Sequence, residues 1–248
     1  MGRSSRRGSL TYYRDDLALV HHLGFGSHAD ATAPGVLALL EPVRGGLVLE
    51  LGCGSGLLTR HLVEAGHRVV ATDASPAMLA LVRETAPGAE VRQLVLPDDL
   101  LPEGDAVVSV GHVLSYLPDE AAVNRALAAA GDALRPGGVL ALDLCDLRYG
   151  ELRRDEPSSS RIAEDWAIVT RFSLPRRSLF VREIAAFLRN EDRTWRRDDE
   201  RHENVLVDTA LVPALLAEHG VQARVAESFG GEDLPDGLVA IVGRKVDG

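Results

Sequence analysis

Cysteine and long apolar runs are scarce in this sequence, and each shortage excludes a class of protein. The two cysteines are too few for a disulfide framework or a four-cysteine zinc site, which favours a reducing compartment and predicts a cytoplasmic location. No stretch approaches the roughly 18 consecutive apolar residues of a membrane span. The first nine residues carry arginines but lack the apolar stretch of a secretory signal. The sequence therefore predicts neither export nor a membrane anchor.

Positive charge is also scarce, since the sequence has 27 basic and 37 acidic residues and therefore a net charge of −10. Such a surface repels polyanions, so we do not expect nucleic acid as a partner. Paired arginines such as Arg196 and Arg197 could form a local basic groove, but solvent-exposed faces explain these pairs at least as well. The 248 residues, 46% of them hydrophobic, are enough for one large folded domain. We expect a monomer or a homodimer.

From Leu47 onwards, short apolar strands alternate with helices. Strands are expected at 47–51, 68–73, 91–96, 105–110 and 139–144, with helices at 57–65, after Ser75 and Pro76, and at 119–134. Ser75 suits the N-cap of its helix and Pro76 the first helical position. Because the strands are almost continuously apolar, they indicate a parallel sheet covered by helices on both faces, which is an α/β fold.

Two segments flank or interrupt this alternation. Residues 1–46 are interpreted as an N-terminal arm with lid helices, at 10–23 and at 33–40 with Pro34 in the first turn. Residues 146–207 contain strand-like runs at 166–172, 179–188 and 205–207, typical of a small antiparallel cap. The sheet domain would comprise 47–145 and 208–248, the latter with a helix at 209–219 and strands at 221–227 and 238–243.

A glycine-rich turn follows the first expected strand, in the run Glu50-Leu51-Gly52-Cys53-Gly54-Ser55-Gly56. Such turns at strand ends bind ligands in doubly wound sheets. The spacing differs from the dinucleotide fingerprint, since Leu57 stands where its third glycine would be. Asp73 ends the second strand, where its carboxylate is placed to accept both hydroxyls of a ribose.

At these residues the chain resembles the class I S-adenosylmethionine-dependent methyltransferases. The resemblance runs from Val48 to Leu144 and, more loosely, from Thr209 to Lys245, with matching landmarks at Glu50–Gly56, Val70–Met78 and Leu134–Gly138. It implies S-adenosyl-L-methionine as the cofactor. It also implies the strand order 3-2-1-4-5-7-6, with an antiparallel seventh strand at 238–243.

The resemblance assigns roles to individual residues. Gly52 and Gly54 would pass close to the methionine part of the cofactor, and Glu50 would hold the loop or the ammonium group. Asp73 would bind the ribose and Met78 would flank the adenine. The adenine amino group would meet Asp98, although a backbone amide near Leu96 would serve equally. The remaining expected cofactor contacts are Tyr13, His21, Ala74 and Val110.

Candidates for a general base lie at two places. His112 follows the fourth strand, where this fold presents its acceptor, and the near-neutral reference pKa of histidine suits proton removal; alternatively, His112 only lines the cofactor pocket or hydrogen-bonds a neighbouring loop. Alternation places Glu200 and His202 on one face of a strand. This face would either line the acceptor site or form an exposed edge of the cap. His21 would sit on a lid or on a surface helix. Tyr13 would cover the site or serve packing alone.

These observations favour methyl transfer to an oxygen or nitrogen of a small molecule such as an amine, a sugar or a natural-product intermediate. No His-x₃-His or Cys-x₂-Cys pair supports a metal site. Two alternatives stay open at this point. One is a nicotinamide-dependent oxidoreductase, and the other is a catalytically silent module that binds the same cofactor.

Overall fold

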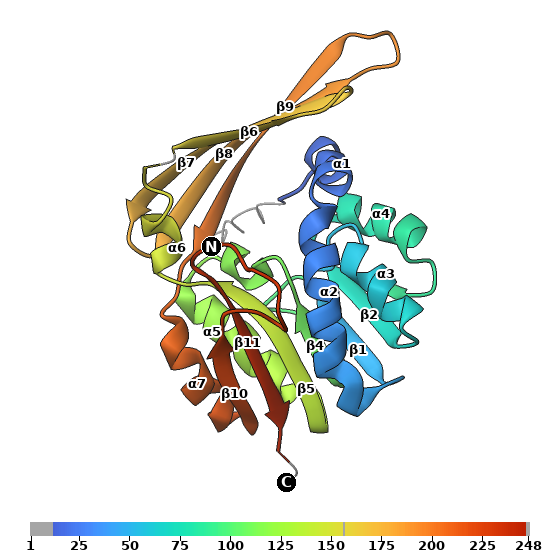
Figure 1. Cartoon of the computed structure of the whole chain (residues 1–248), viewed down its shortest axis with the longest axis vertical. Helices are drawn as coiled ribbons and strands as arrows, with labels where there is room; N and C mark the ends of the chain where they lie inside the picture. Colours follow the sequence, from blue (N-terminus) through green and yellow to red (C-terminus); the bar gives the residue numbers. More distant parts are fainter. Residues whose placement is uncertain (1–11, 156, 247–248) are drawn as a thin grey trace, which may run out of the picture.

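The computed structural model describes residues 12–155 and 157–246 and contains a central seven-stranded sheet (Figure 1). Its order is β10-β11-β5-β4-β1-β2-β3, which confirms the expected strand order once the inserted strands are set aside. The strands are β1 Leu47–Leu51, β2 Arg68–Asp73, β3 Glu90–Gln93, β4 Gly104–Ser109, β5 Leu134–Cys145, β10 Val221–Ala226 and β11 Leu238–Lys245. β11 runs antiparallel to both of its neighbours, as expected.

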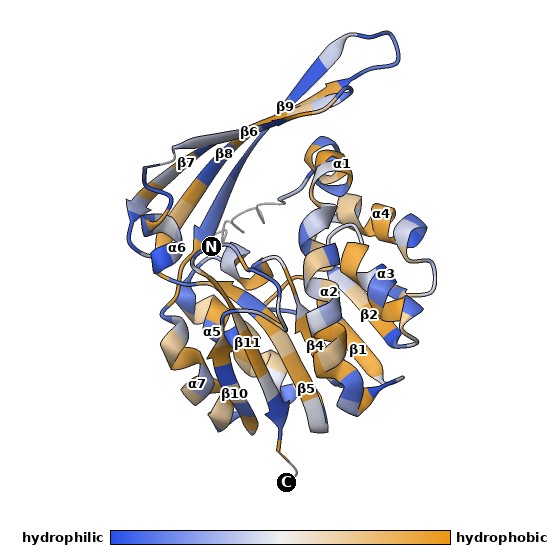
Figure 2. Ribbon diagram, in the orientation of Figure 1, coloured by the Kyte–Doolittle hydropathy of each residue, from blue (hydrophilic) through white to orange (hydrophobic). Residues whose placement is uncertain are grey.

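Helices cover both faces of this sheet and enclose two apolar cores. On one face lie α2 Gly26–Leu40, α3 Leu57–Glu64 and α4 Pro76–Thr85. On the other lie α5 Glu120–Asp132 and α7 Val212–Glu218. The central strands β1, β4 and β5 are mostly hydrophobic (Figure 2) because each faces a helix layer on both sides. This layering brings the carboxyl ends of β1, β2, β4 and β5 to one edge of the sheet.

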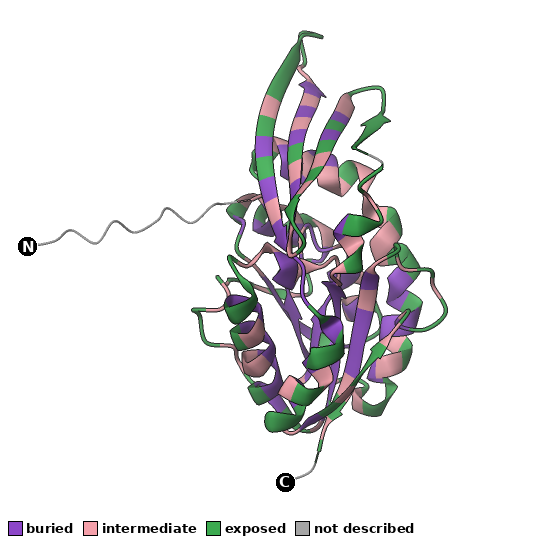
Figure 3. Cartoon of the chain, turned by 90° about the vertical axis from the view of Figure 1, so that its left-hand side faces the viewer, coloured by how far each residue is buried: buried purple, intermediate pink, exposed green. Residues whose placement is uncertain are grey.

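A second, four-stranded antiparallel sheet, hereafter the cap sheet, lies beyond that edge (Figure 1). It consists of β6 Ser158–Ile162, β7 Trp166–Arg176, β8 Leu179–Arg189 and β9 Trp195–Val205. The expected antiparallel cap is thus confirmed. Strand β6 was not expected, and the expected run 205–207 coincides only with the end of β9, where buried and exposed residues alternate around Glu200 and His202 as the sequence predicted. Figure 3 shows this alternation as buried and exposed bands along the cap strands.

The N-terminal helix α1, Asp15–Gly24, packs under the cap sheet. Its Leu17 and Val20 contact the apolar side chains of Ile184 and Leu188 on the inner face of β8. A single residue, Phe25, separates α1 from α2.

The expectation of a helix beginning at residue 33 was wrong. α2 begins at Gly26, so Pro34 lies inside the helix rather than in its first turn. The first turns of α2 carry small and polar residues, which lack a clear apolar period. Four short helices complete the fold: η1 Glu41–Val43, η2 Val113–Tyr116, α6 Arg148–Glu151 and η3 Thr209–Leu211. Within the described ranges, no helix is long and apolar enough to cross a membrane.

Candidate active site

The glycine turn after β1 adopts backbone conformations that other residues rarely take. Gly52 and Gly54 have φ angles of 63° and 54°. A Cβ added to Gly52 would lie 2.2 Å from Cγ1 of Val113, so no larger residue fits there without movement. At Gly54 no atom lies within 4 Å of such a Cβ. The turn therefore packs closely against η2 at Gly52 and stays open at Gly54.

Asp73 holds this turn from the end of β2. Its Oδ2 accepts a hydrogen bond from the backbone N of Gly54 at 3.0 Å, and its Oδ1 accepts one from Ser75 N at 2.8 Å. The two strand ends predicted to share a ligand are therefore in direct contact. Each carboxylate oxygen accepts only one of these bonds and keeps room for a second donor, which fits a ribose with two hydroxyls. Burial raises the pKa of Asp73.

Glu50 ties the turn to α3 from inside the protein. It is 2% exposed, and its carboxylate accepts a hydrogen bond from Thr59 Oγ1 at 2.6 Å. Its backbone O accepts another from Thr72 Oγ1 at 2.8 Å. Burial raises the pKa of Glu50 to about 8. The predicted support of the loop thus has a structural basis, and a contact with the cofactor ammonium stays a prediction.

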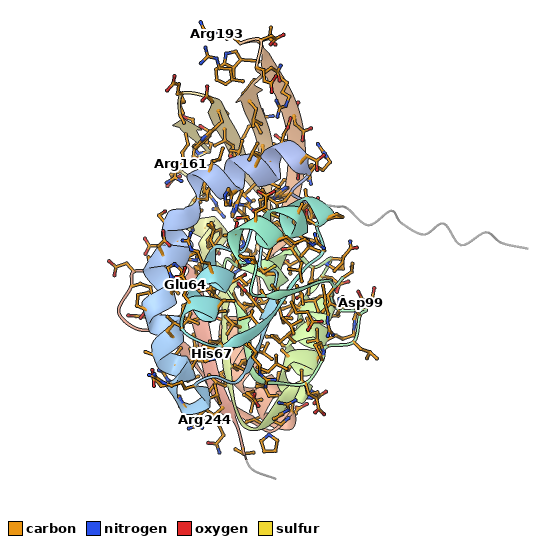
Figure 4. All side chains as sticks on the ribbon, turned by 90° about the vertical axis from the view of Figure 1, so that its right-hand side faces the viewer. Glu64, His67, Asp99, Arg161, Arg193 and Arg244 are labelled. Atoms are coloured by element: carbon orange, nitrogen blue, oxygen red, sulfur yellow. The ribbon has the colours of Figure 1, made fainter. Side chains whose placement is uncertain are left out.

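The residues expected around the adenine differ in their surroundings. Met78 is 2% exposed and packed into the protein, and its backbone N donates to Ser75 Oγ, confirming Ser75 as an N-cap. Ala74 is exposed beside Asp73, and Asp98 is exposed in the turn that follows β3. The neighbouring Asp99 lies at the periphery of the molecule in Figure 4.

Leu96 and Val110 are partly buried and pack against the cores on opposite faces of the sheet. The adenine roles proposed for Asp98 and Leu96, and the cofactor contacts expected of Met78, Ala74 and Val110, stay predictions.

Tyr13 connects the cap sheet to the edge of the central sheet where β2 ends. Its backbone N donates to Glu200 Oε2 at 2.8 Å, and its backbone O accepts a hydrogen bond from Ser75 Oγ at 2.7 Å. Its hydroxyl lies 2.9 Å from that of Tyr116. The ring of His21 meets the Tyr13 ring edge-on at 5.1 Å between centroids, and burial lowers the pKa of His21 to about 4. Tyr13 thus lies over the residues next to Asp73, and its contact with cofactor stays a prediction.

Glu200 and His202 face inward from β9 and bind each other. His202 Nε2 lies 2.8 Å from Glu200 Oε2, and the two residues are 0% and 6% exposed, respectively. The carboxylate also accepts hydrogen bonds from the backbone N atoms of Tyr13 and Arg14. The alternative of an exposed edge is thereby excluded for this pair.

Opposite effects set the charge states of this pair. Burial alone would raise the pKa of Glu200, but hydrogen bonds from His202, Arg14 and Tyr13 outweigh it and lower the pKa. Burial also lowers the pKa of His202, and the bond to Glu200 only partly offsets this. Together these directions favour an ionised Glu200 and a neutral His202. The Nε2–H group of His202 then donates a hydrogen bond to the carboxylate. Nδ1 of His202 is buried and has no hydrogen-bond partner in the described part of the chain.

His112 lies across the Tyr116 ring from His202. Asp143, 0% exposed on β5, accepts hydrogen bonds from the backbone N atoms of Gly111 and His112 at 2.9 and 2.6 Å. These bonds hold His112 at a φ of 51° and stack its ring on Tyr116 with 5.6 Å between centroids. The His202 ring also packs against Tyr116, with 5.5 Å between the ring centroids. Burial and the charge of Arg182 lower the pKa of His112 well below its ordinary value.

Sequence reasoning missed several residues that organise this region: Tyr116, Asp143, Tyr149 and Arg182. Asp143 carried a signal, because it is an acidic residue inside the apolar strand Leu140–Cys145. Arg182 carried none, since only the register of β8 against β9 sets it opposite His202.

Comparisons with known proteins agree with this geometry. Residues 48–138 match a family model described as a methyltransferase domain. A ubiquinone biosynthesis O-methyltransferase from Xanthomonas axonopodis pv. citri is 37% identical over 114 residues, 43% of this chain and 46% of that protein. A second such enzyme, from Xylella fastidiosa, is matched over 42% of its length. The chain therefore spans less than half the length of these curated relatives.

Solved structures resemble nearly the whole chain. An S-adenosylmethionine-dependent methyltransferase from Clostridium acetobutylicum superposes with a TM-score of 0.78 at 15% identity, covering 93% of this chain and 98% of that one. The sugar N-methyltransferase KedS8 from Streptoalloteichus superposes with a TM-score of 0.74 at 23% identity, covering 97% and 98%. The likeness therefore includes the cap sheet as well as the central sheet.

Proposed function

We propose that this chain, whose residues 48–138 match a methyltransferase domain and whose fold is that of the class I S-adenosylmethionine-dependent methyltransferases, transfers a methyl group from that cofactor to an oxygen or nitrogen of a small molecule. The observation that carries the proposal is the Asp73 carboxylate, which joins the glycine turn to the end of β2. This arrangement suits an adenosyl group at the carboxyl edge of the sheet.

The residues around Asp73 would bind the cofactor in defined ways. The second acceptor position of each Asp73 oxygen would receive one ribose hydroxyl. The open backbone at Gly54 would let the methionine part approach the turn closely. When bound, the sulfonium supplies an already activated methyl group, so the protein needs mainly to align the acceptor and exclude water.

His202 is the better-placed general base of the two candidates. Its Nε2–H donates to Glu200, which fixes the ring and leaves Nδ1 as the proton acceptor. Glu200 would act as a positioning residue, since it binds the imidazole and stabilises the charge that follows proton uptake. His112 is the weaker candidate, because burial and the positive charge of Arg182 keep its pKa well below the ordinary value.

The cap sheet supports a small acceptor. It covers the carboxyl edge of the central sheet with aromatic and polar side chains, and the net charge of −10 disfavours a nucleic acid. Two of the matched relatives are O-methyltransferases of ubiquinone biosynthesis, which act on a small molecule. An enzyme of this kind needs no partner chain to complete the described contacts of Asp73, Glu200 and His202.

Calorimetry with S-adenosylmethionine and S-adenosylhomocysteine tests the cofactor assignment. Asp73→Ala should weaken binding by about 100-fold, because two charge-assisted hydrogen bonds of about 1.5 kcal/mol each are lost. Asp105→Ala is the matched control, since Asp105 also accepts a backbone hydrogen bond, from Leu47 N at 2.7 Å, but at the opposite edge of the sheet. Unchanged affinity in Asp73→Ala, or preferential binding of a nicotinamide dinucleotide, would count against the proposal.

A second experiment tests the base with a panel of phenol, amine and sugar acceptors. His202→Asn should lower kcat by about 10²- to 10⁴-fold while S-adenosylhomocysteine affinity is kept. Glu200→Gln should cause a smaller loss and shift the pH profile, as expected of a positioning residue. Wild-type turnover in His202→Asn together with a large loss in His112→Asn would transfer the role to His112.

A further inference from the structure

Arg182 extends from the inner face of β8 into the same cluster of side chains. Its cross-strand partners are His202 on β9 and Phe172 on β7. The guanidinium donates to the Tyr116 hydroxyl and lies 5.4 Å from the centroid of that ring. Its Nε is buried without a hydrogen-bond partner among the residues that the structure describes. The side chain is therefore fixed by neutral aromatic groups, with part of its donor capacity unused.

No acidic side chain in the described ranges lies within 4.0 Å of the Arg182 nitrogens, the limit used for an ion pair. Outside those ranges, residues 1–11 contain no aspartate or glutamate, whereas Glu156 and Asp247 are acidic. The neighbouring acidic groups are the phenols of Tyr13, Tyr116 and Tyr149 and the thiol of Cys145. Burial raises the pKa of Tyr116, Tyr149 and Cys145, so these groups stay neutral and cannot balance the positive charge.

A second guanidinium approaches this cluster from α6 and the residues that follow it. Arg153 lies 3.6 Å from the centroid of the Tyr149 ring and donates to the backbone O atoms of Tyr149 and Asp236. In the described chain it too has no acidic side chain within ion-pair distance. The positive charges of Arg153 and Arg182 both act on His112 and lower its pKa. His112 thus lies near two guanidinium groups as well as near the Asp143 carboxylate that binds its backbone N.

An arginine keeps its charge under all ordinary conditions, and burying that charge without an anion is costly. Such a cost is consistent with a ligand that supplies the missing negative group. The Tyr116 ring, which contacts both His112 and His202, places this charge beside both candidate bases. A ligand bound there would present its nucleophilic atom near the groups that take up the proton.

We infer, on the basis of the proposed function, that the methyl acceptor carries an anionic group, a carboxylate or a phosphate. Arg182 is the residue that binds this group. A guanidinium offers two parallel N–H donors that match two oxygens of either anion. The Tyr116 hydroxyl, which accepts from Arg182, and Arg153, which stacks on the Tyr149 ring, would complete the anion site. Arg182 is therefore a specificity-determining residue rather than a base.

The test uses the full chain saturated with S-adenosylhomocysteine and three probes of similar size: benzoate, phenyl phosphate and neutral benzyl alcohol. Calorimetry should show that one of the two anions binds at least tenfold more tightly than the alcohol. Arg182→Gln should remove this preference. Arg171→Gln is the matched control, because Arg171 lies on the outer face of the same sheet and pairs with Glu183. It should leave all three affinities unchanged.

The outcomes separate the sources of the anion. Preference for benzoate assigns a carboxylate acceptor, and preference for phenyl phosphate assigns a phosphate-bearing one. Equal affinities for the three probes in the wild-type chain would overturn the inference, as would equal losses in Arg182→Gln and Arg171→Gln. Failure of the wild-type chain to bind S-adenosylhomocysteine would instead contradict the proposed function, and it is seen before any probe is added.

Thermal unfolding gives a second readout that does not depend on one variant. The preferred anion should raise the Tm of the wild-type chain, whereas benzyl alcohol should not. Arg182→Met should have a higher Tm than the wild-type chain without anion, because it removes an unbalanced buried charge, and it should gain nothing from the anion. If Arg182→Gln does not fold, Arg182→Lys keeps the charge and should bind the anion more weakly than the wild-type chain but still prefer it to the alcohol. A Tm that the anion leaves unchanged in the wild-type chain would contradict the inference.

Discussion

The two faces of the cap sheet carry acidic residues at adjacent positions of β9, in contrasting surroundings. Asp199 on the outer face is exposed and pairs with Arg197 at 2.7 Å. Glu200 on the inner face is 6% exposed and accepts hydrogen bonds from Tyr13, Arg14 and His202. Successive residues of a strand point to opposite faces, so one step along the chain moves a carboxylate from water into the protein.

The same contrast applies to the arginines of β7 and β8. On the outer face Arg171 pairs with Glu183 in water, where the energy of the pair is small. On the inner face Arg182 donates to the Tyr116 hydroxyl and has no carboxylate within ion-pair distance among the described residues. Charge on the outer face keeps the sheet soluble, whereas charge on the inner face is retained despite its cost. This difference is what the proposed function expects, because the acceptor would bind at the inner face.

The largest expected effect comes from removing Glu200. Glu200→Ala leaves the buried His202 and the partly buried backbone N atoms of Tyr13 and Arg14 without an acceptor, and should lower the free energy of unfolding by about 3 to 5 kcal/mol. Asp199→Ala, one residue away on the outer face, should change it by less than about 0.5 kcal/mol. Urea unfolding of both variants measures the difference. Similar losses in the two variants would show that the faces do not differ as described.

Apolar residues should show the same contrast with a smaller effect. Ile184 is 6% exposed and packs against α1, so Ile184→Ala should lower the free energy of unfolding by about 2 to 4 kcal/mol. Val169 is 45% exposed on the outer face, and Val169→Ala should cost less than about 1 kcal/mol. Urea unfolding measures the loss of stability in both variants. A larger loss in Val169→Ala than in Ile184→Ala would contradict the assignment of the inner face as the apolar one.

The inner histidines should make stability depend on pH. The folded state lowers the pKa of His112 and His202 below 6.5, so it favours their neutral forms. The unfolded chain takes up protons as the pH falls below about 6.5, and this contribution to stability is then lost. The free energy of unfolding should therefore decrease between pH 7 and pH 5. The decrease should be shallower in His202→Asn, and an unchanged slope in that variant would refute this expectation.

The smallest effect is expected for the outer ion pair. A double-mutant cycle on Arg171 and Glu183 should give a coupling of about 0.2 to 1 kcal/mol that decreases with added salt. A coupling above about 2 kcal/mol would mean that water does not screen this face as its exposure implies.

Much of the central sheet was predictable because its signals are local. The apolar strands at 47–51 and 68–73, and the Ser75-Pro76 helix start, needed only neighbouring residues to be recognised. The strand order and the antiparallel β11 came from the family resemblance rather than from periodicity. Gly54 and Asp73 could be paired because parallel strands end at a common edge.

The acceptor side was harder to predict because its contacts depend on tertiary register. Arg182 and His202 are 20 positions apart, and only the pairing of β8 with β9 makes them neighbours. Tyr13 contacts Glu200 across 187 positions, a contact that no local pattern reports. The alternation along β9 could place Glu200 and His202 on one face, but only the fold shows that this face is the inner one.

The hydrogen bonds of Tyr13 to Ser75 and Glu200 make the two ends of the described chain unequal for protein engineering. β11 finishes at Lys245, on the edge of the sheet remote from Asp73 (Figure 1). An affinity tag or fluorescent fusion attached beyond that strand leaves the Tyr13 contacts alone. One attached ahead of Tyr12 adds its bulk next to the link between the two sheets, so expression vectors for this chain should carry their tag at the carboxyl end.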